Sequence, residues 1–242
     1  MTRNGSLDLQ TILDRILYLD DDLLILNKPN RLPLYRGPGG GVVLGDFLEG
    51  LRFGLSELPS PAHRLDSATS GCLVLGRHVA SRRMLGDLFA QKLVEKIYWA
   101  IVDGRPPEPS GLIALPLRDV GWAGRPRVRV DEQGKMAETA FRTLGYWENQ
   151  TLLELLPITG RTHQLRVHCA VMGCPIVGDY LYNAQFPSEL PLHLHARRLT
   201  LFLMNPLTVE ADCPDHMVVD QFAGFVTGIN FCRQKNDERD GL

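Results

Sequence analysis

The chain has 242 residues, of which 44% are hydrophobic and 22% are charged, with a formal net charge of −2 at pH 7. This balance is typical of a globular protein of one large or two small domains and excludes a disordered or fibrous chain. There is no apolar run of about 18 residues and no secretory signal at the start, so we expect a cytoplasmic protein without a membrane anchor. The five cysteines form no CxxC pair, which argues against a disulfide framework or a thiolate zinc site.

Charge is distributed unevenly along the chain. Lys and Arg against Asp and Glu number 6 and 8 in residues 1–60, 11 and 6 in residues 61–130, and 9 and 14 in residues 131–242. The central segment is therefore +5. Contacts to a polyanion need local rather than net positive charge, so this segment is a candidate for a surface that faces phosphates. A scatter of solvated charges explains the same count equally well.

The first forty residues predict a short helix, a hairpin and a loop. Apolar residues at positions 9, 12, 13 and 16 recur at helical spacing. Two apolar runs, 16–19 and 23–26, flank three aspartates and predict the strands of a hairpin that ends at Lys28-Pro29. Residues 31–41 are rich in Pro and Gly, so we expect a loop there.

The middle of the chain predicts a long helix, a strand and a loop. Residues 80–96 place apolar side chains from Met84 to Leu93 on one face and charges on the other, as in an amphipathic helix. Residues 97–102 then predict a strand. The Pro- and Gly-rich stretch 104–124 predicts a loop within the domain rather than a boundary between domains.

The last part of the chain predicts further strands and two helices. Strands are expected near Glu138–Leu144, Thr151–Leu156, Leu199–Leu203 and Leu207–Glu210. A short helix over 162–172 should end at Gly173, and a closing helix is expected over 218–229. Strands and helices mix without a regular βαβ alternation, which favours an α+β domain built on a sheet.

A polar loop with the sequence HRLDSATSG covers residues 63–71 and leads directly into the apolar strand 72–75. An aspartate at the mouth of a strand, among small hydroxyl residues, occupies a place where catalytic groups are common. Asp66 is therefore a candidate catalytic residue. Its alternative role is to cap a turn together with Ser67 and Thr69.

A second segment, KIYWAIVDG, covers residues 96–104 and reads as a strand. Successive side chains of a strand point to opposite faces, so Tyr98 should face away from Ile97 and Trp99. On this pattern alone it is either a core tyrosine or a site residue.

A third segment, GRTHQLRVH, covers residues 160–168 and is followed by GCPIVGD at 173–179. It concentrates two arginines, two histidines and a glutamine on about two helical turns. The five-residue step from His163 to His168 does not suit a zinc helix, whose two histidines lie four residues apart on one face. We therefore expect no metal site.

Together these segments resemble the RluA-type pseudouridine synthases. The patterns HRLDxxTSG, KxYxAxVxG and GRTHQxRVHxxxxGxPIxGD, with LHAxxL at 194–199, match in order and spacing from about Leu23 to Leu207. The resemblance implies the pseudouridine synthase catalytic fold, α+β with a mixed, largely antiparallel sheet flanked by helices. It implies an isomerase that acts on transfer or ribosomal RNA without metal or organic cofactor. Many relatives carry a small RNA-binding module before this fold, whereas we expect a single catalytic domain over 1–242 without that module.

The resemblance also implies roles for individual residues. Asp66 corresponds to the essential aspartate, and Arg64 to an arginine that helps to displace the target base. Tyr98 corresponds to the tyrosine that stacks on the flipped uracil. Arg166 corresponds to the arginine paired with the aspartate, with Arg161 as an open alternative. The other candidates for substrate binding are His63, Thr162, His163 and Gln164.

The chemistry of the reaction suits these residue types. A uracil must leave the helix before it can turn, and an inserted arginine and a stacking tyrosine hold it outside. Asp66 must stay ionised in a partly dry pocket, which a bidentate contact from Arg166 would favour. Attack on the ring, attack on the sugar and a glycal route remain open, as does the identity of the uridine. The loop at 30–35 departs from the family pattern, which puts the choice of substrate in doubt.

Two other classes of protein were weighed. An RNA-binding protein with this fold but without chemistry would have no need of an intact Asp66. A hydrolase built on Ser70, with Asp66 and either His63 or His163, lacks the first glycine of the GxSxG turn.

Overall fold

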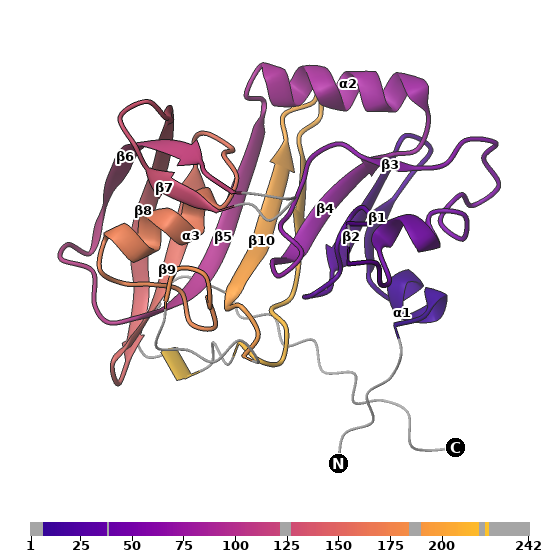
Figure 1. The fold of residues 1–242 in the computed structure, drawn as a ribbon. Helices are drawn as coiled ribbons and strands as arrows, with labels where there is room; N and C mark the ends of the chain where they lie inside the picture. Colours follow the sequence, from indigo (N-terminus) through magenta and orange to yellow (C-terminus); the bar gives the residue numbers. More distant parts are fainter. Residues whose placement is uncertain (1–6, 38, 122–126, 184–189, 218–220, 223–242) are drawn as a thin grey trace, which may run out of the picture.

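The computed structural model describes residues 7–37, 39–121, 127–183, 190–217 and 221–222. These residues form one sheet of eleven strands with helices packed against it (Figure 1). The strand order is β1-β2-β4-β10-β5-β9-β8-β6-β7, with β11 beside β10 and β3 beside β4. The sheet is mixed and largely antiparallel, so the predicted α+β fold class is confirmed. Within the described part of the chain, no helix is long and apolar enough to cross a membrane.

The first ninety residues of the chain build one flank of the sheet. Its elements are α1 (Leu9–Leu13), β1 (Ile16–Leu19), β2 (Leu23–Lys28), the 3-10 helix η1 (Leu44–Phe47), β3 (Ser60–Pro61), β4 (Ser70–Gly76) and α2 (Val79–Ala90). β1 and β2 form the predicted hairpin, and β2 pairs antiparallel with β4. The predicted opening helix and hairpin are confirmed, although Ile16 belongs to the strand.

The rest of the chain builds the centre and the other flank. Its elements are β5 (Val94–Asp103), β6 (Ser110–Asp119), β7 (Val128–Val130), β8 (Lys135–Trp147), β9 (Gln150–Pro157), α3 (Gln164–Val171), β10 (Leu194–Leu201) and β11 (Leu207–Glu210). The predicted strands of this part are present, with β10 displaced toward the N-terminus of its expected range. The short helix is confirmed, and Gly173 follows it with a φ of 84°. Most of the expected closing helix lies outside the described residues.

The two flanks meet where β10 lies between β4 and β5 (Figure 1). β10 pairs antiparallel with β5 but parallel with β4, over the two pairs His195–Ser70 and Ala196–Gly71. Gly71 has a φ of 107°, and a Cβ added to it would lie 2.3 Å from the carbonyl oxygen of Ala196. Only glycine fits at this close approach. The loop that carries Asp66 therefore enters the sheet at the junction of the flanks.

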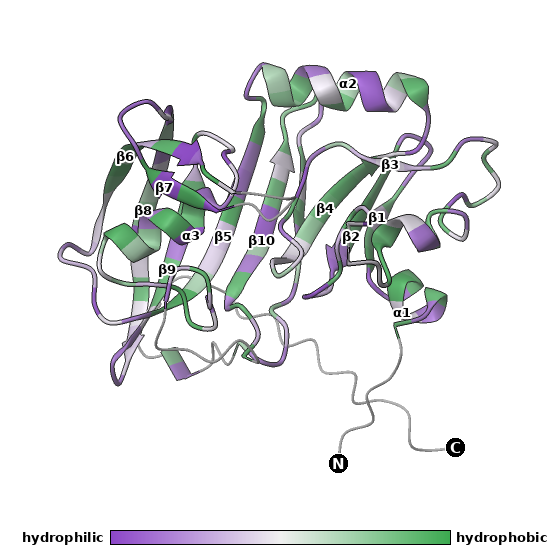
Figure 2. Ribbon diagram, in the orientation of Figure 1, coloured by the Kyte–Doolittle hydropathy of each residue, from purple (hydrophilic) through white to green (hydrophobic). Residues whose placement is uncertain are grey.

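The central strands are buried on both faces. Along β5, Tyr98 belongs to the main core cluster, whereas Ile97, Trp99 and Ile101 belong to a second cluster on the other face. The predicted alternation is thus confirmed. Every residue of β4 is buried, and Figure 2 shows hydrophobic residues along most of that strand.

Two predictions about the middle of the chain were wrong. The helix α2, in which hydrophilic and hydrophobic residues alternate (Figure 2), ends at Ala90 instead of continuing to 96. Lys92 has a φ of 60°, which breaks the helix, and Leu93 lies beyond it, 38% exposed. The stretch 104–124 contains the ten-residue strand β6 instead of only a loop, because β6 pairs with β8 from Ser110 to Leu117.

Candidate active site

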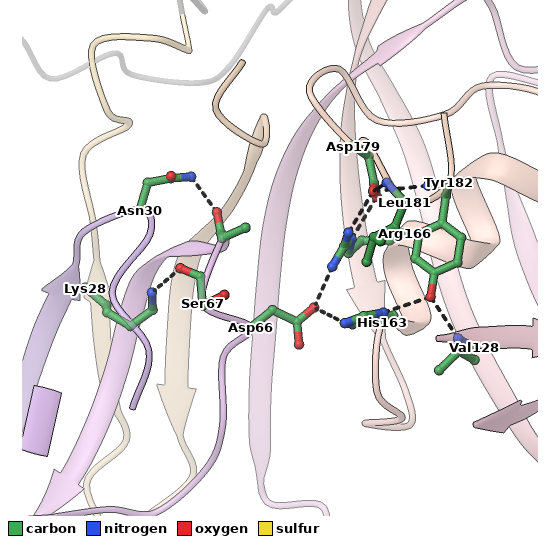
Figure 3. Close-up of polar contacts among 11 residues, drawn as sticks. Lys28, Asn30, Asp66, Ser67, Val128, His163, Arg166, Asp179, Leu181 and Tyr182 are labelled. Atoms are coloured by element: carbon green, nitrogen blue, oxygen red, sulfur yellow. Dashed lines mark hydrogen bonds and ion pairs between the residues drawn. The ribbon is translucent and has the colours of Figure 1, made fainter. Parts of the chain in front are cut away.

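Asp66 lies in the loop before β4 and lines a cleft between the two flanks. The amide of Thr69 donates to the carbonyl of Asp66 at 3.0 Å, which closes a turn directly before the strand. The Asp66 side chain is 17% exposed. Its Oδ2 lies 3.5 Å from Nη1 of Arg166 and 3.7 Å from Nε2 of His163 (Figure 3).

The backbone of this loop is held from the N-terminal flank. Lys28, at the end of β2, is 0% exposed, and its Nζ donates to the carbonyls of Pro29, Leu32 and Ser67 at 2.9, 3.0 and 3.1 Å. The side-chain amide of Asn30 donates to the carbonyl of Ala68 (Figure 3). Burial lowers the pKa of Lys28 to about 7, but only the ammonium form has a donor for each of the three carbonyls. Lys28 thereby ties the 29–32 segment to the Asp66 loop.

Arg166, on α3, approaches the carboxylate of Asp66 from the other flank. The predicted bidentate contact between these two residues is wrong, because the fork of Arg166 is taken by Asp179. Nε and Nη2 of Arg166 donate to the two Asp179 carboxylate oxygens, each at 2.7 Å, and both residues are buried. Burial opposes the charge of Arg166, but the bonds to Asp179 raise its pKa. This leaves Nη1 to face Asp66.

His163 precedes α3 in the left-handed conformation, with a φ of 52°. Its Nδ1 lies 2.7 Å from the hydroxyl of Tyr182, which accepts a hydrogen bond from the Val128 amide at 2.9 Å. Burial lowers the pKa of His163 from its usual value, which favours the neutral ring. The carboxylate of Asp66 can only accept, so the tautomer that satisfies every group has Nδ1 accepting from Tyr182 and Nε2–H facing Asp66.

The cleft has two lobes that share Arg64, Leu65, Asp66, His163 and Arg166. The smaller lobe, of about 90 Å³, is also lined by Tyr98. The larger lobe measures about 760 Å³ and extends to the loop after β2 and to the turn at 178–183. Asp66 lies where the lobes meet. Burial raises the pKa of Tyr98, so its hydroxyl stays protonated.

Comparison with known proteins decides the family. The sequence model described as RNA pseudouridylate synthase matches residues 22–171. The chain belongs to this family. An uncharacterized RNA pseudouridine synthase of Zymomonas mobilis is 39% identical over 209 residues, which covers 83% of this chain and 94% of that protein. Ribosomal large subunit pseudouridine synthase C of Haemophilus ducreyi is 36% identical, covering 81% of this chain and 62% of its own.

The fold comparison agrees. The structure of human RNA pseudouridylate synthase domain containing 4 superposes with a TM-score of 0.75 at 28% identity, over 88% of this chain and 94% of that one. Mitochondrial pseudouridylate synthase RPUSD4 of Rattus norvegicus is 35% identical, and the match covers 81% of this chain but 64% of the rat protein. The prediction of an RluA-type RNA pseudouridine synthase is confirmed, and the chain is an isomerase of RNA.

The synthase brings most of the predicted site residues to one cleft. Arg64 is exposed and lines both lobes, while Thr162 and Arg161 line the smaller one. The choice between two arginines is resolved in favour of Arg166. Arg161 is exposed, donates to the carbonyl of Met136 at 3.3 Å and makes no ion pair with another described residue.

Two residues predicted to bind substrate, His63 and Gln164, instead have their polar atoms bonded to other residues of the protein. His63 lines neither lobe: its Nε2 accepts from the Val74 amide at 3.1 Å and its ring packs on Phe89. Burial lowers the pKa of His63 to about 3, so it stays neutral. Gln164 has no free donor or acceptor. Its side-chain carbonyl accepts from the Thr159 hydroxyl and the Arg161 backbone amide. Its side-chain amide donates to the Glu138 backbone carbonyl and the Thr139 hydroxyl.

Three residues of the synthase's site were not assigned a role from the sequence. Lys28 was interpreted only as the end of a strand, because lysine is rarely buried and nothing in the sequence marks this one as an exception. Asp179 lay in a recognised motif, but the sequence analysis assigned it no partner. Tyr182, three residues further on, lay outside the motifs altogether.

Proposed function

We propose that Asp66 is the catalytic carboxylate with which this synthase isomerises a uridine of ribosomal or transfer RNA. The observation that carries the proposal is the position of the Asp66 carboxylate at the junction of the two lobes, facing Arg166 Nη1 at 3.5 Å and His163 Nε2 at 3.7 Å. A carboxylate in a closed site needs such partners to stay ionised, because burial alone favours the protonated form.

The reaction requires one bond to break and one to form. The bond from ribose C1′ to N1 of uracil breaks, the base turns, and C1′ bonds to C5. The proton at C5 leaves and N1 gains a proton. Because the base must first leave its stack, we assign the smaller lobe to the flipped uracil, with Tyr98 against its face and Arg64 filling the space that it vacates.

Each chemical route uses the same ionised Asp66. It attacks the ring or the sugar, or assists removal of a sugar proton to give a glycal. Arg166 supports all three, because Asp179 fixes its guanidinium while Nη1 remains directed at Asp66. Arg166 is thus both partner of the carboxylate and part of the wall between the lobes.

The names of relatives favour one class of RNA. The Haemophilus and Rickettsia proteins are named for the large ribosomal subunit, which supports ribosomal RNA over transfer RNA. A cytoplasmic location belongs to the same proposal. The mitochondrial names of the rat and mouse relatives make the organelle the alternative compartment.

The decisive experiment compares the wild type with Asp66→Asn, which removes the charge with little change of shape. RNA from cells that lack the enzyme is labelled with tritium at uridine C5 and separated into ribosomal and transfer fractions. We expect the variant to release tritium at least about a hundredfold more slowly, the usual range for loss of an acid or base being ~10²–10⁴. RNA binding in a gel shift should persist.

The matched control is Asp21→Asn, in the exposed turn of the first hairpin, which should release tritium at the wild-type rate. Melting curves verify that both variants fold. A folded Asp66→Asn protein with wild-type release would refute the assignment of Asp66. Release from the transfer fraction alone would replace ribosomal by transfer RNA as the substrate.

A further inference from the structure

Tyrosine exposure is concentrated in one place on the molecule. All six tyrosines lie within the described residues, and only Tyr35 and Tyr180 are exposed, at 67% and 54%. Both line the larger lobe of the cleft. Neither phenol hydroxyl makes a hydrogen bond to another described residue. An aromatic ring left in water beside an active site is available for a ligand to cover.

The backbone holds Tyr35 in this position. Its neighbour Leu34 is buried, 6% exposed, and points into the core. The carbonyl of Pro33 accepts from the Leu44 amide at 2.8 Å, and Lys28 binds the carbonyl of Leu32. With the preceding residues fixed, the Tyr35 ring is directed out of the core toward the cleft.

Tyr180 is held in a comparable way from the other side. Asp179 before it is 0% exposed and bonded to Arg166. The amide of Asn183 donates to the carbonyl of Asp179 at 2.8 Å, closing the turn. Gly178 has a φ of 77°, and a Cβ there would lie 2.0 Å from the carbonyl oxygen of Pro191. The buried Asp179 thus leaves Tyr180 facing outward.

The charges around the larger lobe suit a polyanion. Arg64 lines it, is exposed, and forms no ion pair with any residue that the structure describes. Asp66 is the only acidic residue among those that line this lobe. Its volume of about 760 Å³ falls in the range of ~300–1,000 Å³ that encloses a molecule of nucleotide size.

We infer that the larger lobe binds an unpaired nucleotide adjacent to the target uridine, its base stacked on Tyr35 or Tyr180 and its phosphate beside Arg64. The inference rests on the proposed function, because Asp66 marks where the target uridine lies and the chain of the RNA must continue from there. Every base has a face that can stack, so this subsite selects for an unpaired neighbour rather than for a particular base. It supplies a reason why an RNA loop would be preferred to a duplex.

Binding of fluorescein-labelled RNA oligomers tests the inference by fluorescence anisotropy. The probes are decauridylate and a decamer of the same ribose-phosphate chain without bases. The wild type should prefer decauridylate, and at least one of the variants Tyr35→Ala and Tyr180→Ala should weaken its binding by about 5- to 150-fold, the equivalent of losing one stacked base. Their affinity for the baseless decamer should stay at the wild-type value. Tyr35→Phe and Tyr180→Phe should retain affinity for decauridylate, since the ring is kept.

The matched control is Trp147→Ala, which removes another exposed aromatic ring that lines neither lobe. It should leave binding unchanged. Equal affinity of the wild type for both probes, or unaltered binding of decauridylate by both tyrosine variants, would overturn the inference. Failure of the proposed function is distinguishable, because it would show in the tritium release of Asp66→Asn and not in these affinities.

Discussion

The two walls of the cleft hold the same residue in different ways. On the N-terminal side, Lys28 and Asn30 bind backbone carbonyls of the loop after Asp66, so they fix where the loop runs. On the other side, Arg166 and His163 approach the carboxylate itself. Among the described residues, Lys28 and Asn30 make no hydrogen bond or ion pair with the carboxylate, and Arg166 and His163 make no hydrogen bond to the loop backbone.

The first wall therefore controls the position of the loop that carries Asp66, and the second controls the charged groups around its carboxylate. A change in the first wall should move the loop and leave the ion-pair partners of the carboxylate, Arg166 and His163, in place, although the charge of Lys28 also acts on Asp66 through space. A change in the second wall should alter the ionic partners of Asp66 while its loop stays where it is. Three substitutions test whether the two functions are separable in this way.

The largest effect is expected for Asp179→Asn in the second wall. Arg166 and Asp179 are 4% and 0% exposed, so loss of the carboxylate strands a buried guanidinium. Breaking a buried ion pair costs ~3–5 kcal/mol, and we expect urea unfolding to show about 3 kcal/mol because the asparagine keeps one acceptor. Tritium release should fall as well, since Asp179 then no longer fixes the guanidinium with its Nη1 directed at Asp66.

The control for Asp179→Asn is Glu210→Gln, which removes the partner of Arg197 at the surface. Its side chain is 48% exposed, and exposed pairs contribute ~0–1 kcal/mol. Equal losses of stability in the two variants would contradict the view that the Arg166–Asp179 pair organises the second wall.

An intermediate effect is expected for Lys28→Met in the first wall. The methionine fills the space but leaves three carbonyls without a donor, a loss partly offset by removing a buried charge. We expect a net cost of about 2 kcal/mol. Hydrogen exchange should become faster in the peptide over 62–70 and stay unchanged over 97–102. The control Lys92→Met, at an exposed position, should show neither change; uniform acceleration along the chain would contradict a local clamp.

The smallest effect is expected for Tyr182→Phe. The variant removes the hydroxyl that orients His163 and leaves the Val128 amide without its acceptor. If the lost ordering costs the transition state about 1 kcal/mol, turnover falls about fivefold. Tyr18→Phe is the control, because its hydroxyl donates to Asp20 far from the cleft. A similar loss of turnover in both variants would exclude a positioning role for Tyr182.

The sequence predicted most of the site because the chemistry is concentrated in short motifs. Asp66, Tyr98 and Arg166 come from three such segments, and the fold brings them to one cleft; their catalytic roles remain predictions. The partner of Arg166 could not be predicted, since Asp179 and Asp66 both lay in motifs and only distance distinguishes them. Gln164 was misassigned for a related reason, because a motif does not reveal whether an amide is already satisfied.

The fold was predictable where local patterning agrees with tertiary structure. The hairpin of β1 and β2 and the helix α3 have clear turn and end signals. β6 was missed because its Pro and Gly residues obscure the alternation, and the strand is stabilised by pairing with β8 rather than by its own propensity. The end of α2 was misplaced for a similar reason, since Leu93 continues the helical spacing after the backbone has turned.

The insertion of β10 between β4 and β5 has a consequence for the order of folding. β4 and β5 follow one another in the chain, yet the strand that joins them arrives about a hundred residues later. During synthesis from the N-terminus, the two flanks must wait for residues 194–201 before they can be joined into one sheet. Pairings so distant in sequence form slowly. Ribosome-bound chains that end before β10 should therefore lack the closed cleft, and the enzyme acquires its active site only after residues 194–201 have been synthesised.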